Sequence, residues 1–483
     1  MVVFRRAVLA PAPQHEPAAA LALPAFPDPE QLDSALTAFL HSSADQLCQW
    51  WSQSSQRSPL PLLSVLPEVA PGLDGLDASS LLDDLQLVMD GAFNPVHPGS
   101  LAHLDPPPLT ASVAADLICA GLNNNLLAEE LSPSLSRLER SLTAWMAESL
   151  GLGDQAGGVA ASGGSLSNLM ALVVAREQAG LRGEQRAVVF CSADAHVSLG
   201  KALAVMGLPP TALQPLAVDR AGQLDVLVLE EALDRAARQG TPVLAVVATA
   251  GTTVCGAVDP LAPIAALCRS RGHWLHVDGA IGAVFGLCQS QRHRVAGLEL
   301  ADSITVNPQK LLGITKTSSL LLLRQPQLLA QSFGTGLPYM EPSWVDAHGG
   351  ECGLQGTRPA EVLKLWLGLR QLGLRGIETL LSGAIERRRN LQALLEPLPL
   401  QCSTGALHLL AFTPRAGDAA AAEAWSLQTR QRLLEQQLML SRPLYQGRHH
   451  LKAVLGNPHT GQQELQTLAN VLADSCSMPP SPH

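Results

Sequence analysis

From about His97 onward, short apolar runs of strand length alternate with segments in which apolar residues recur at helical spacing. The strand-like runs cover residues 187–191, 243–249, 274–277, 303–306 and 319–323. Runs without a polar face are typical of strands buried on both sides, as strands are in parallel sheets. The pattern therefore predicts an α/β fold in which a mainly parallel central sheet carries helices on both faces.

The flanking parts of the chain have a different character. Helical patterns cover residues 29–51 and 79–87, and the Pro- and Ala-rich residues 11–30 are expected to be disordered or to lie along the surface. Residues 360–372 predict a long helix, and mixed helices and short strands follow it. We therefore expect a helical N-terminal arm (1–92, the first ~30 residues disordered), a large α/β domain (93–370) and a small C-terminal α+β domain (371–483).

The composition excludes several classes of protein. Charged residues make up 15% of the 483 residues and the net charge is -10, so the chain lacks the basic stripe that nucleic acid requires. No apolar run approaches the ~20 residues needed to cross a bilayer, and Pro11 and Pro13 interrupt the start of the chain too early for a signal peptide. We expect a cytoplasmic protein that binds neither nucleic acid nor membranes.

The nine cysteines are scattered along the chain and form no C-x-x-C pair. Their neighbours are mostly apolar, which favours buried free thiols over disulfides or a zinc site. We therefore expect no metal, and a reducing compartment agrees with this cysteine usage.

Two residues just past buried strands offer complementary chemistry. Asp278 follows the run 274–277, and Lys310 comes four residues after the run 303–306. Parallel strands end at the same edge of a sheet, so the carboxylate and the amine should meet there. A pyridoxal phosphate enzyme needs this pair, because the amine forms a Schiff base with the cofactor aldehyde and the carboxylate holds the pyridine nitrogen protonated. A lysine after a strand is by itself usually a solvated end, so the prediction depends on the pair.

A glycine turn supplies a candidate phosphate site. Ser162, Gly163, Gly164 and Ser165 stand directly before an apolar-periodic helix, whose first N–H groups and dipole would favour an anion, and Ser165 adds a hydroxyl. Such turns also begin helices that bind no ligand. The motif is neither a Walker loop nor G-x-G-x-x-G, which disfavours a nucleotide triphosphate or a dinucleotide.

Two further strand ends carry polar residues. His196 follows the run 187–191, where an imidazole could stack on a flat aromatic cofactor and contact a substrate carboxylate; it could equally cap its own loop. Thr252 and Thr253 follow the run 243–249. A hydroxyl there could lie beside the cofactor ring, although turn formation explains a threonine equally well.

With these residues in place, the chain resembles the group II pyridoxal phosphate-dependent amino-acid decarboxylases from about His97 through the helix after Arg358, and more faintly to its end. The resemblance implies a fold-type I enzyme in which Lys310 forms the Schiff base and Asp278 pairs with the pyridine nitrogen. Ala280 would pack on one face of the ring and His196 would stack on the other. It also implies that Thr253 lies near the ring and that phosphate is bound by Gly164, Ser165 and Asn307.

Two positions depart from the family pattern. Gln309 stands where a histidine commonly precedes the lysine, so any proton relay assigned to that position is in doubt, and Gly279 replaces the first alanine of the usual Asp-Ala-Ala. Tyr339 matches a tyrosine of the family's mobile catalytic loop. Its hydroxyl is a candidate for returning a proton to Cα, although packing of the loop explains it as well.

The segment from His97 to Pro106 resembles the family's substrate-lining segment, with His103 and Leu104 where the aromatic amino acid decarboxylases tend to present aromatic rings. An aromatic substrate is therefore disfavoured, and the segment is most similar to that of L-2,4-diaminobutyrate decarboxylases. Asp105 or Glu130 could face a substrate ammonium, or both could simply be exposed. An acidic substrate stays an alternative to diaminobutyrate. Transamination or a lyase step with the same cofactor stays an alternative to decarboxylation. The family also implies a homodimer with the active site at its interface.

Overall fold

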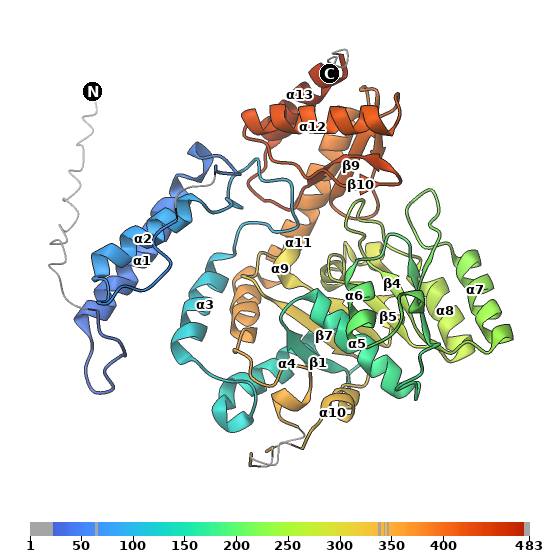
Figure 1. Cartoon of the computed structure of the whole chain (residues 1–483), viewed down its shortest axis with the longest axis horizontal. Helices are drawn as coiled ribbons and strands as arrows, with labels where there is room; N and C mark the ends of the chain where they lie inside the picture. The colour runs from blue at the N-terminus through green and yellow to red at the C-terminus, as the bar shows by residue number, and fades with distance from the viewer. Residues whose placement is uncertain (1–22, 63–65, 337–339, 342, 345–346, 478–483) are drawn as a thin grey trace, which may run out of the picture. The chain divides into compact units, whose positions relative to one another are not determined.

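The computed structural model of the chain describes residues 23–62, 66–336, 340–341, 343–344 and 347–477. By its internal contacts the chain divides into two compact units, Met1–His97 and Pro98–His483 (Figure 1). The predicted domain boundaries at residues 92 and 371 stay predictions.

The first unit contains two helices that run close to the predicted ranges, α1 (Ser34–Ser52) and α2 (Ala78–Asp90), and a short 3-10 turn, η1 (Ser54–Gln56). An aspartate begins each α-helix: the Asp33 carboxylate accepts from Leu36 N, and the Asp77 carboxylate accepts from Ser80 N. The side-chain amide of Gln46 donates to Leu82 O over 2.9 Å and joins the two helices. Most of the segment expected to be disordered, residues 1–22, lies outside the described residues.

The second unit is built around a seven-stranded sheet in the order β1-β7-β6-β5-β4-β2-β3. Its strands are β1 (Gly157–Ala161), β2 (Val188–Ser192), β3 (Leu213–Leu216), β4 (Val243–Thr249), β5 (Leu275–Gly279), β6 (Ser303–Val306) and β7 (Ser319–Leu323). Only β7 is antiparallel to its neighbours, β6 and β1. The predicted mainly parallel sheet is therefore confirmed, with all five predicted strands within two residues of their observed bounds.

The two strands that the apolar pattern missed lie at the edges of this sheet. β1 has the sequence Gly-Gly-Val-Ala-Ala, in which small residues weaken the apolar signal. β3 contains Pro215, which cannot donate to a ladder and is tolerated at a sheet edge. Edge strands need less burial than central ones, so their sequences carry less of the pattern.

Helices cover both faces of the sheet (Figure 1). One core cluster joins β2 and β4 to α5 (Gly164–Gln178) and α6 (Ser198–Val205), as Val189 and Val247 pack with Leu172 and Leu199. The opposite faces of the same strands pack against α4 (Pro133–Ser149), α7 (Val226–Gln239), α8 (Leu261–Arg271) and α11 (Val362–Leu395) in the main core. Alternate residues of the buried strands thus face two different helical layers.

The second unit also contains shorter helices and 3-10 turns. They are α3 (Thr110–Leu122), η2 (Glu129–Leu131), η3 (Pro210–Ala212), η4 (Ala283–Leu287), η5 (Arg292–Val295), η6 (Leu298–Leu300), α9 (Pro308–Leu311), α10 (Gln327–Phe333) and η7 (Gly349–Glu351). The predicted helix 360–372 corresponds to the first part of α11. Gly373, with φ of 58°, interrupts the helix where the prediction ends.

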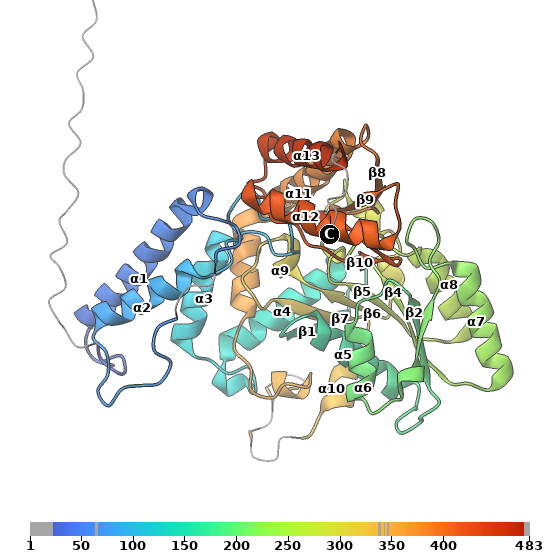
Figure 2. The ribbon, with the colours of Figure 1, turned by 45° about the horizontal axis from the view of Figure 1, so that its top comes forward.

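The C-terminal part forms a smaller antiparallel sheet in the order β12-β9-β8. Its elements are β8 (Leu400–Ser403), β9 (Leu409–Pro414), α12 (Ala419–Glu435), β10 (Leu444–Tyr445), β11 (Arg448–His449), β12 (Leu451–Val454) and α13 (Gln462–Ser477). They lie together at one end of the second unit (Figure 2). The expected mixture of helices and short strands after residue 372 is confirmed.

All nine cysteines are free thiols, five of them buried. Within the described ranges no group of three or more His, Cys, Asp or Glu residues is arranged to hold a metal ion. None of the helices in the described part of the chain has both the length and the hydropathy needed to cross a membrane.

Candidate active site

One cavity at the carboxyl edge of the large sheet is lined by all eight residues that the sequence predicts for cofactor binding: Gly164, Ser165, His196, Thr253, Asp278, Ala280, Asn307 and Lys310. The same cavity is lined by Asn168, Thr249, Gly251, Thr252 and Ile281. These residues are brought together from five different strand ends. The structure therefore places the predicted residues side by side, in the position where α/β sheets bind ligands.

The sheet topology explains this convergence. Asp278 is the fourth residue of β5, and Lys310 lies in the short helix α9 that begins directly after β6. Since β5 and β6 are parallel neighbours, with Asp278 paired to Thr305, both residues reach the same edge. The turns after β2 and β4 supply His196 and Thr253 to that edge.

The glycine turn forms the start of α5 at one end of the cavity. Gly163 has a φ of 111°, which favours glycine. A Cβ at Gly164 would lie 2.9 Å from Asn307 Nδ2, so glycine is also required for the close approach of α5 to Asn307. The Asn307 side chain accepts a hydrogen bond from Ser319 Oγ over 2.7 Å, which orients its amide. The helix N-terminus, the Ser165 hydroxyl and the Asn307 amide together offer donors to an anion.

Asp278 lies at the buried side of the cavity. Its Oδ2 accepts from Asn168 Nδ2 over 2.8 Å, and its Oδ1 accepts from Ala280 N over 3.2 Å. The sequence analysis missed Asn168, which is buried one helical turn after Gly164 on α5. A polar residue on the buried side of an otherwise apolar helix was the available signal.

Lys310 carries the amine that the sequence predicts to be reactive. Burial lowers the pKa of Lys310, while the carboxylates of Asp278 and Asp105 oppose this shift. A lowered pKa increases the fraction of neutral amine at neutral pH, and only the neutral amine is a nucleophile. The next residue back, Gln309, has a structural contact: its Oε1 accepts from Ser318 N over 2.6 Å.

The ring of His196 faces the cavity, whereas the hydroxyl of Thr252 is used within its own turn. Burial lowers the pKa of His196. The charges of Lys310 and Lys201 lower it further and that of Asp278 opposes them, so a neutral ring faces the cavity. His196 Nδ1 also accepts from Ser198 N over 3.2 Å, which fixes the ring. The Thr252 hydroxyl accepts from Ala257 N over 3.1 Å. It therefore stabilises a turn, which is the alternative to a place beside the cofactor ring.

Lys452 is a second amine near the cavity, and the sequence analysis did not find it. It lies on β12, and its Nζ donates to Thr253 O over 3.1 Å. Burial and then repulsion from Lys310 lower the pKa of Lys452 to about 8. No local pattern marks this residue, because a lysine between apolar residues of a strand is an ordinary sequence feature.

The predicted substrate residues do not line this cavity. His103 lines a separate hollow with Arg430 and Arg442, Leu104 packs against the main core, and Glu130 is exposed. Asp105 is half-buried and forms an ion pair of 3.2 Å with Lys316, and its charge opposes the lowering of the Lys310 pKa. Of these predicted substrate residues, Asp105 is thus the one with an electrostatic effect on Lys310. Tyr339 lies outside the described residues.

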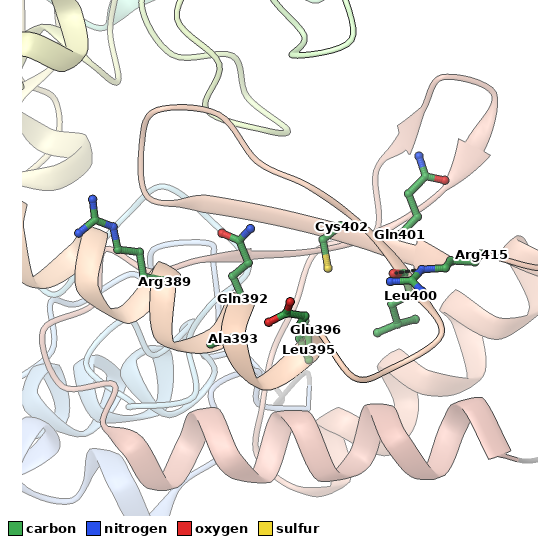
Figure 3. Close-up of a pocket in the computed structure, with 9 residues that line it drawn as sticks. All are labelled: Arg389, Gln392, Ala393, Leu395, Glu396, Leu400, Gln401, Cys402 and Arg415. Carbon is green, nitrogen blue, oxygen red and sulfur yellow. Dashed lines mark hydrogen bonds between the residues drawn. The ribbon is translucent and has the colours of Figure 1, made fainter.

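A further hollow lies in the C-terminal part, between the end of α11 and strand β8 (Figure 3). Arg389 and Arg415 extend in different directions at its two ends, and Glu396 lies between them. The Arg415 Nε donates to Leu400 O over 2.9 Å. The charged side chains of this hollow do not converge on one point, in contrast to those around Lys310.

Comparison with known proteins agrees with this geometry. Residues 66–399 match the pyridoxal-dependent decarboxylase conserved domain. The chain therefore belongs to the group II pyridoxal phosphate-dependent decarboxylases. It is an amino-acid decarboxylase, a carboxy-lyase, and its cofactor is pyridoxal 5'-phosphate.

Individual relatives differ in the substrate that their names give. An L-2,4-diaminobutyrate decarboxylase of Rhizobium meliloti is 30% identical over 90% of this chain and 88% of its own length. An aromatic-L-amino-acid decarboxylase of Bacillus atrophaeus is 32% identical over 67% of this chain and 68% of its own length. The crystal structure of Oryza sativa TDC with PLP and tryptamine shares the fold, with a TM-score of 0.86 at 23% identity, over 94% of this chain and 99% of that one.

The residues of the cavity fit this cofactor. Its phosphate would lie at the N-terminus of α5 near Ser165 and Asn307, where donors converge. Its pyridine nitrogen would face Asp278, which accepts hydrogen bonds from two neutral donors, an amide and a backbone N–H. When bound, the cofactor supplies a conjugated ring that withdraws electrons from the substrate Cα.

Proposed function

We propose that this enzyme decarboxylates a small non-aromatic L-amino acid, and that L-2,4-diaminobutyrate is the first candidate. The proposal starts from Asp105, a half-buried carboxylate outside the cavity that pairs with Lys316 over 3.2 Å and whose charge opposes the lowering of the Lys310 pKa. A substrate with a second ammonium group needs such a carboxylate close to the reacting centre. The similarity to the Rhizobium meliloti relative over 90% of the chain supports this choice.

The proposed roles of the cavity residues follow from their positions. Lys310 would hold the cofactor through its aldehyde, and Asp278 would keep the pyridine nitrogen protonated. Ala280 and His196 would contact the two faces of the ring, with Thr253 near it; all of these residues line the cavity. For the return of a proton to the substrate Cα, Tyr339 stays the predicted donor.

A substrate panel tests the choice of substrate. We expect release of carbon dioxide to be fastest with L-2,4-diaminobutyrate, since a well-made ion pair with Asp105 discriminates by ~1.5–3 kcal/mol, about ten- to a hundredfold. Asp105→Asn should raise KM selectively for diaminobutyrate. Asp116→Asn is a matched control, because Asp116 is also a partly exposed aspartate that pairs with a lysine, at 3.6 Å from Lys364. Equal loss for all substrates in Asp105→Asn would contradict the role of this residue.

An acidic substrate such as aspartate, glutamate or cysteine sulfinate is the second candidate. Lys452 favours it, because this partly buried amine donates to Thr253 O at the cavity and would attract a substrate carboxylate. The same panel decides between the two candidates, since preference for an acidic amino acid would exclude diaminobutyrate. Transamination or a lyase step on the same scaffold would give a keto acid or a cleaved side chain instead of a primary amine and carbon dioxide.

We also propose that the enzyme is a homodimer with its active site at the interface. Exposed apolar side chains on α3 support this proposal, namely Leu117, Ile118 and Leu122, each at least half exposed. Light scattering should give twice the chain mass of 50.8 kDa. Ile118→Glu should shift the mass toward the monomer, whereas Leu427→Glu, at a similarly exposed leucine of α12, should not. A monomeric wild-type enzyme would contradict the proposal.

A further inference from the structure

A series of buried polar side chains extends from Asp278 away from the cavity. Asn168, His276, Ser303 and Thr305 are all buried, and Trp274 lies at the far end of the series. The distances are 2.8 Å from Asn168 Nδ2 to Asp278 Oδ2, 3.1 Å from His276 Nε2 to Asn168 Oδ1, 2.9 Å from His276 Nδ1 to Ser303 Oγ, and 3.0 Å from Trp274 Nε1 to Ser303 Oγ. Buried polar groups of this kind must satisfy each other.

The direction of the first hydrogen bonds follows from Asp278. An ionised carboxylate only accepts, so the amide nitrogen of Asn168 must face it. The second amide hydrogen is used by Ser198 Oγ, at 3.0 Å. The Asn168 Oδ1 therefore points the other way, where it accepts from the Thr305 hydroxyl over 2.7 Å and lies 3.1 Å from His276 Nε2. A carbonyl oxygen only accepts, so His276 Nε2 must carry a hydrogen.

The remaining directions depend on the charge of His276. Complete burial lowers the pKa of His276 to about 4, although the charge of Asp278 and the backbone of Ser303 oppose this shift, so the ring is neutral at neutral pH. A neutral ring with hydrogen on Nε2 has a free lone pair on Nδ1, which accepts from the Ser303 hydroxyl. Ser303 Oγ in turn accepts from the Trp274 indole, which is only a donor. The opposite tautomer would set two lone pairs against each other between His276 and Asn168.

We propose that Trp274, Ser303, His276 and Asn168 form a one-way hydrogen-bond chain in which every donor points toward Asp278, and that they act as positioning residues for this carboxylate. The proposal rests on the proposed role of Asp278 as partner of the pyridine nitrogen. Asn168 holds Oδ2 and the Ala280 N–H holds Oδ1, which aims the remaining lone pairs into the cavity. The outer members of the chain fix the orientation of the Asn168 amide, which could otherwise turn its oxygen toward Asp278.

The protonation state of His276 tests the chain independently of catalysis. In full-length enzyme labelled with nitrogen-15 histidine, the His276 signals, assigned by their loss in His276→Gln, should show hydrogen on Nε2 and none on Nδ1 between pH 6 and 8. In Ser303→Ala the hydrogen should stay on Nε2, because Asn168 Oδ1 still requires a donor, while the Nδ1 signal should shift because its hydrogen-bond donor is gone. A cationic ring or an Nδ1–H tautomer in the wild type would overturn the proposal, whether or not the enzyme is an active decarboxylase.

Cofactor affinity provides the second readout. Thr305→Val and Ser303→Ala each remove one hydroxyl that does not line the cavity, and each should weaken binding of added pyridoxal phosphate to the cofactor-depleted protein about 5- to 10-fold, the effect of one hydrogen bond. Thr143→Val is the matched control, since the buried Thr143 hydroxyl on α4 bonds Glu139 O. Affinities equal to those of the control would refute the chain. Loss of affinity with normal substrate preference would support it even if the proposed substrate proves wrong.

Discussion

Replacement of Lys310 by alanine is expected to reduce turnover to below about one thousandth of the wild-type rate, because a lysine amine that bonds the cofactor also carries protons during the reaction, and proton transfer alone contributes ~10²–10⁴-fold. The other amine near the cavity, Lys452, is held by Thr253 O and does not occupy this position. The measurement is carbon dioxide release at saturating substrate.

Borohydride reduction supplies the matching chemical test. The wild-type protein should retain the cofactor covalently on the peptide that contains Lys310, and the Lys310→Ala protein should not. Lys201→Ala is a suitable control, because Lys201 is an exposed lysine of α6 that acts on His196 only through its charge. If the cofactor labelled another residue of the wild-type protein, Lys310 would not have its proposed role.

Asp278→Asn is expected to keep the fold and to lower kcat about 100- to 1000-fold, the effect of losing one partner of a buried charge pair, ~3–4 kcal/mol. The amide has the same shape as the carboxylate, and its oxygen can still accept from Asn168. It cannot hold a proton on the pyridine nitrogen, so the cofactor loses its power to withdraw electrons.

The thermal unfolding midpoint separates this effect from damage to the fold. We expect the midpoint of Asp278→Asn to fall by no more than a few degrees, since the amide oxygen keeps the hydrogen bond from Asn168 and only one buried donor, the Ala280 N–H, loses its acceptor. Near-normal turnover in this variant would refute the proposed role of Asp278. A large fall in the unfolding midpoint would instead assign Asp278 a structural role.

Most of the central sheet could be predicted because its strands are buried on both faces. Burial on both sides demands an uninterrupted apolar run, and such runs are visible in the sequence at β2, β4, β5, β6 and β7. The residues directly after these runs were predictable for the same reason. Parallel topology collects strand ends at one edge, so Asp278 and Lys310 could be placed together without knowledge of the packing.

The side-chain directions in the substrate-lining segment could not be predicted in this way. His103, Leu104 and Asp105 are consecutive, yet His103 lines a separate hollow, Leu104 joins the core and only Asp105 acts on Lys310. In a segment without regular structure, side-chain direction depends on contacts made far along the chain. One such contact is the ion pair of Asp105 with Lys316, more than 200 residues away in sequence.

The amino-acid sequence alone thus predicted the α/β class and the pairing of Asp278 with Lys310, because both residues lie within a few positions of a local apolar run. The resemblance of the sequence to the decarboxylase family supplied the other residues that line the cavity. The tertiary structure alone decided the partners of those residues. Asn168 reaches Asp278 across 110 positions, and Lys452 reaches Thr253 across 199. Local periodicity reflects which face of an element is buried, whereas the identity of a long-range neighbour depends on how whole elements pack, and no short segment of sequence contains that information.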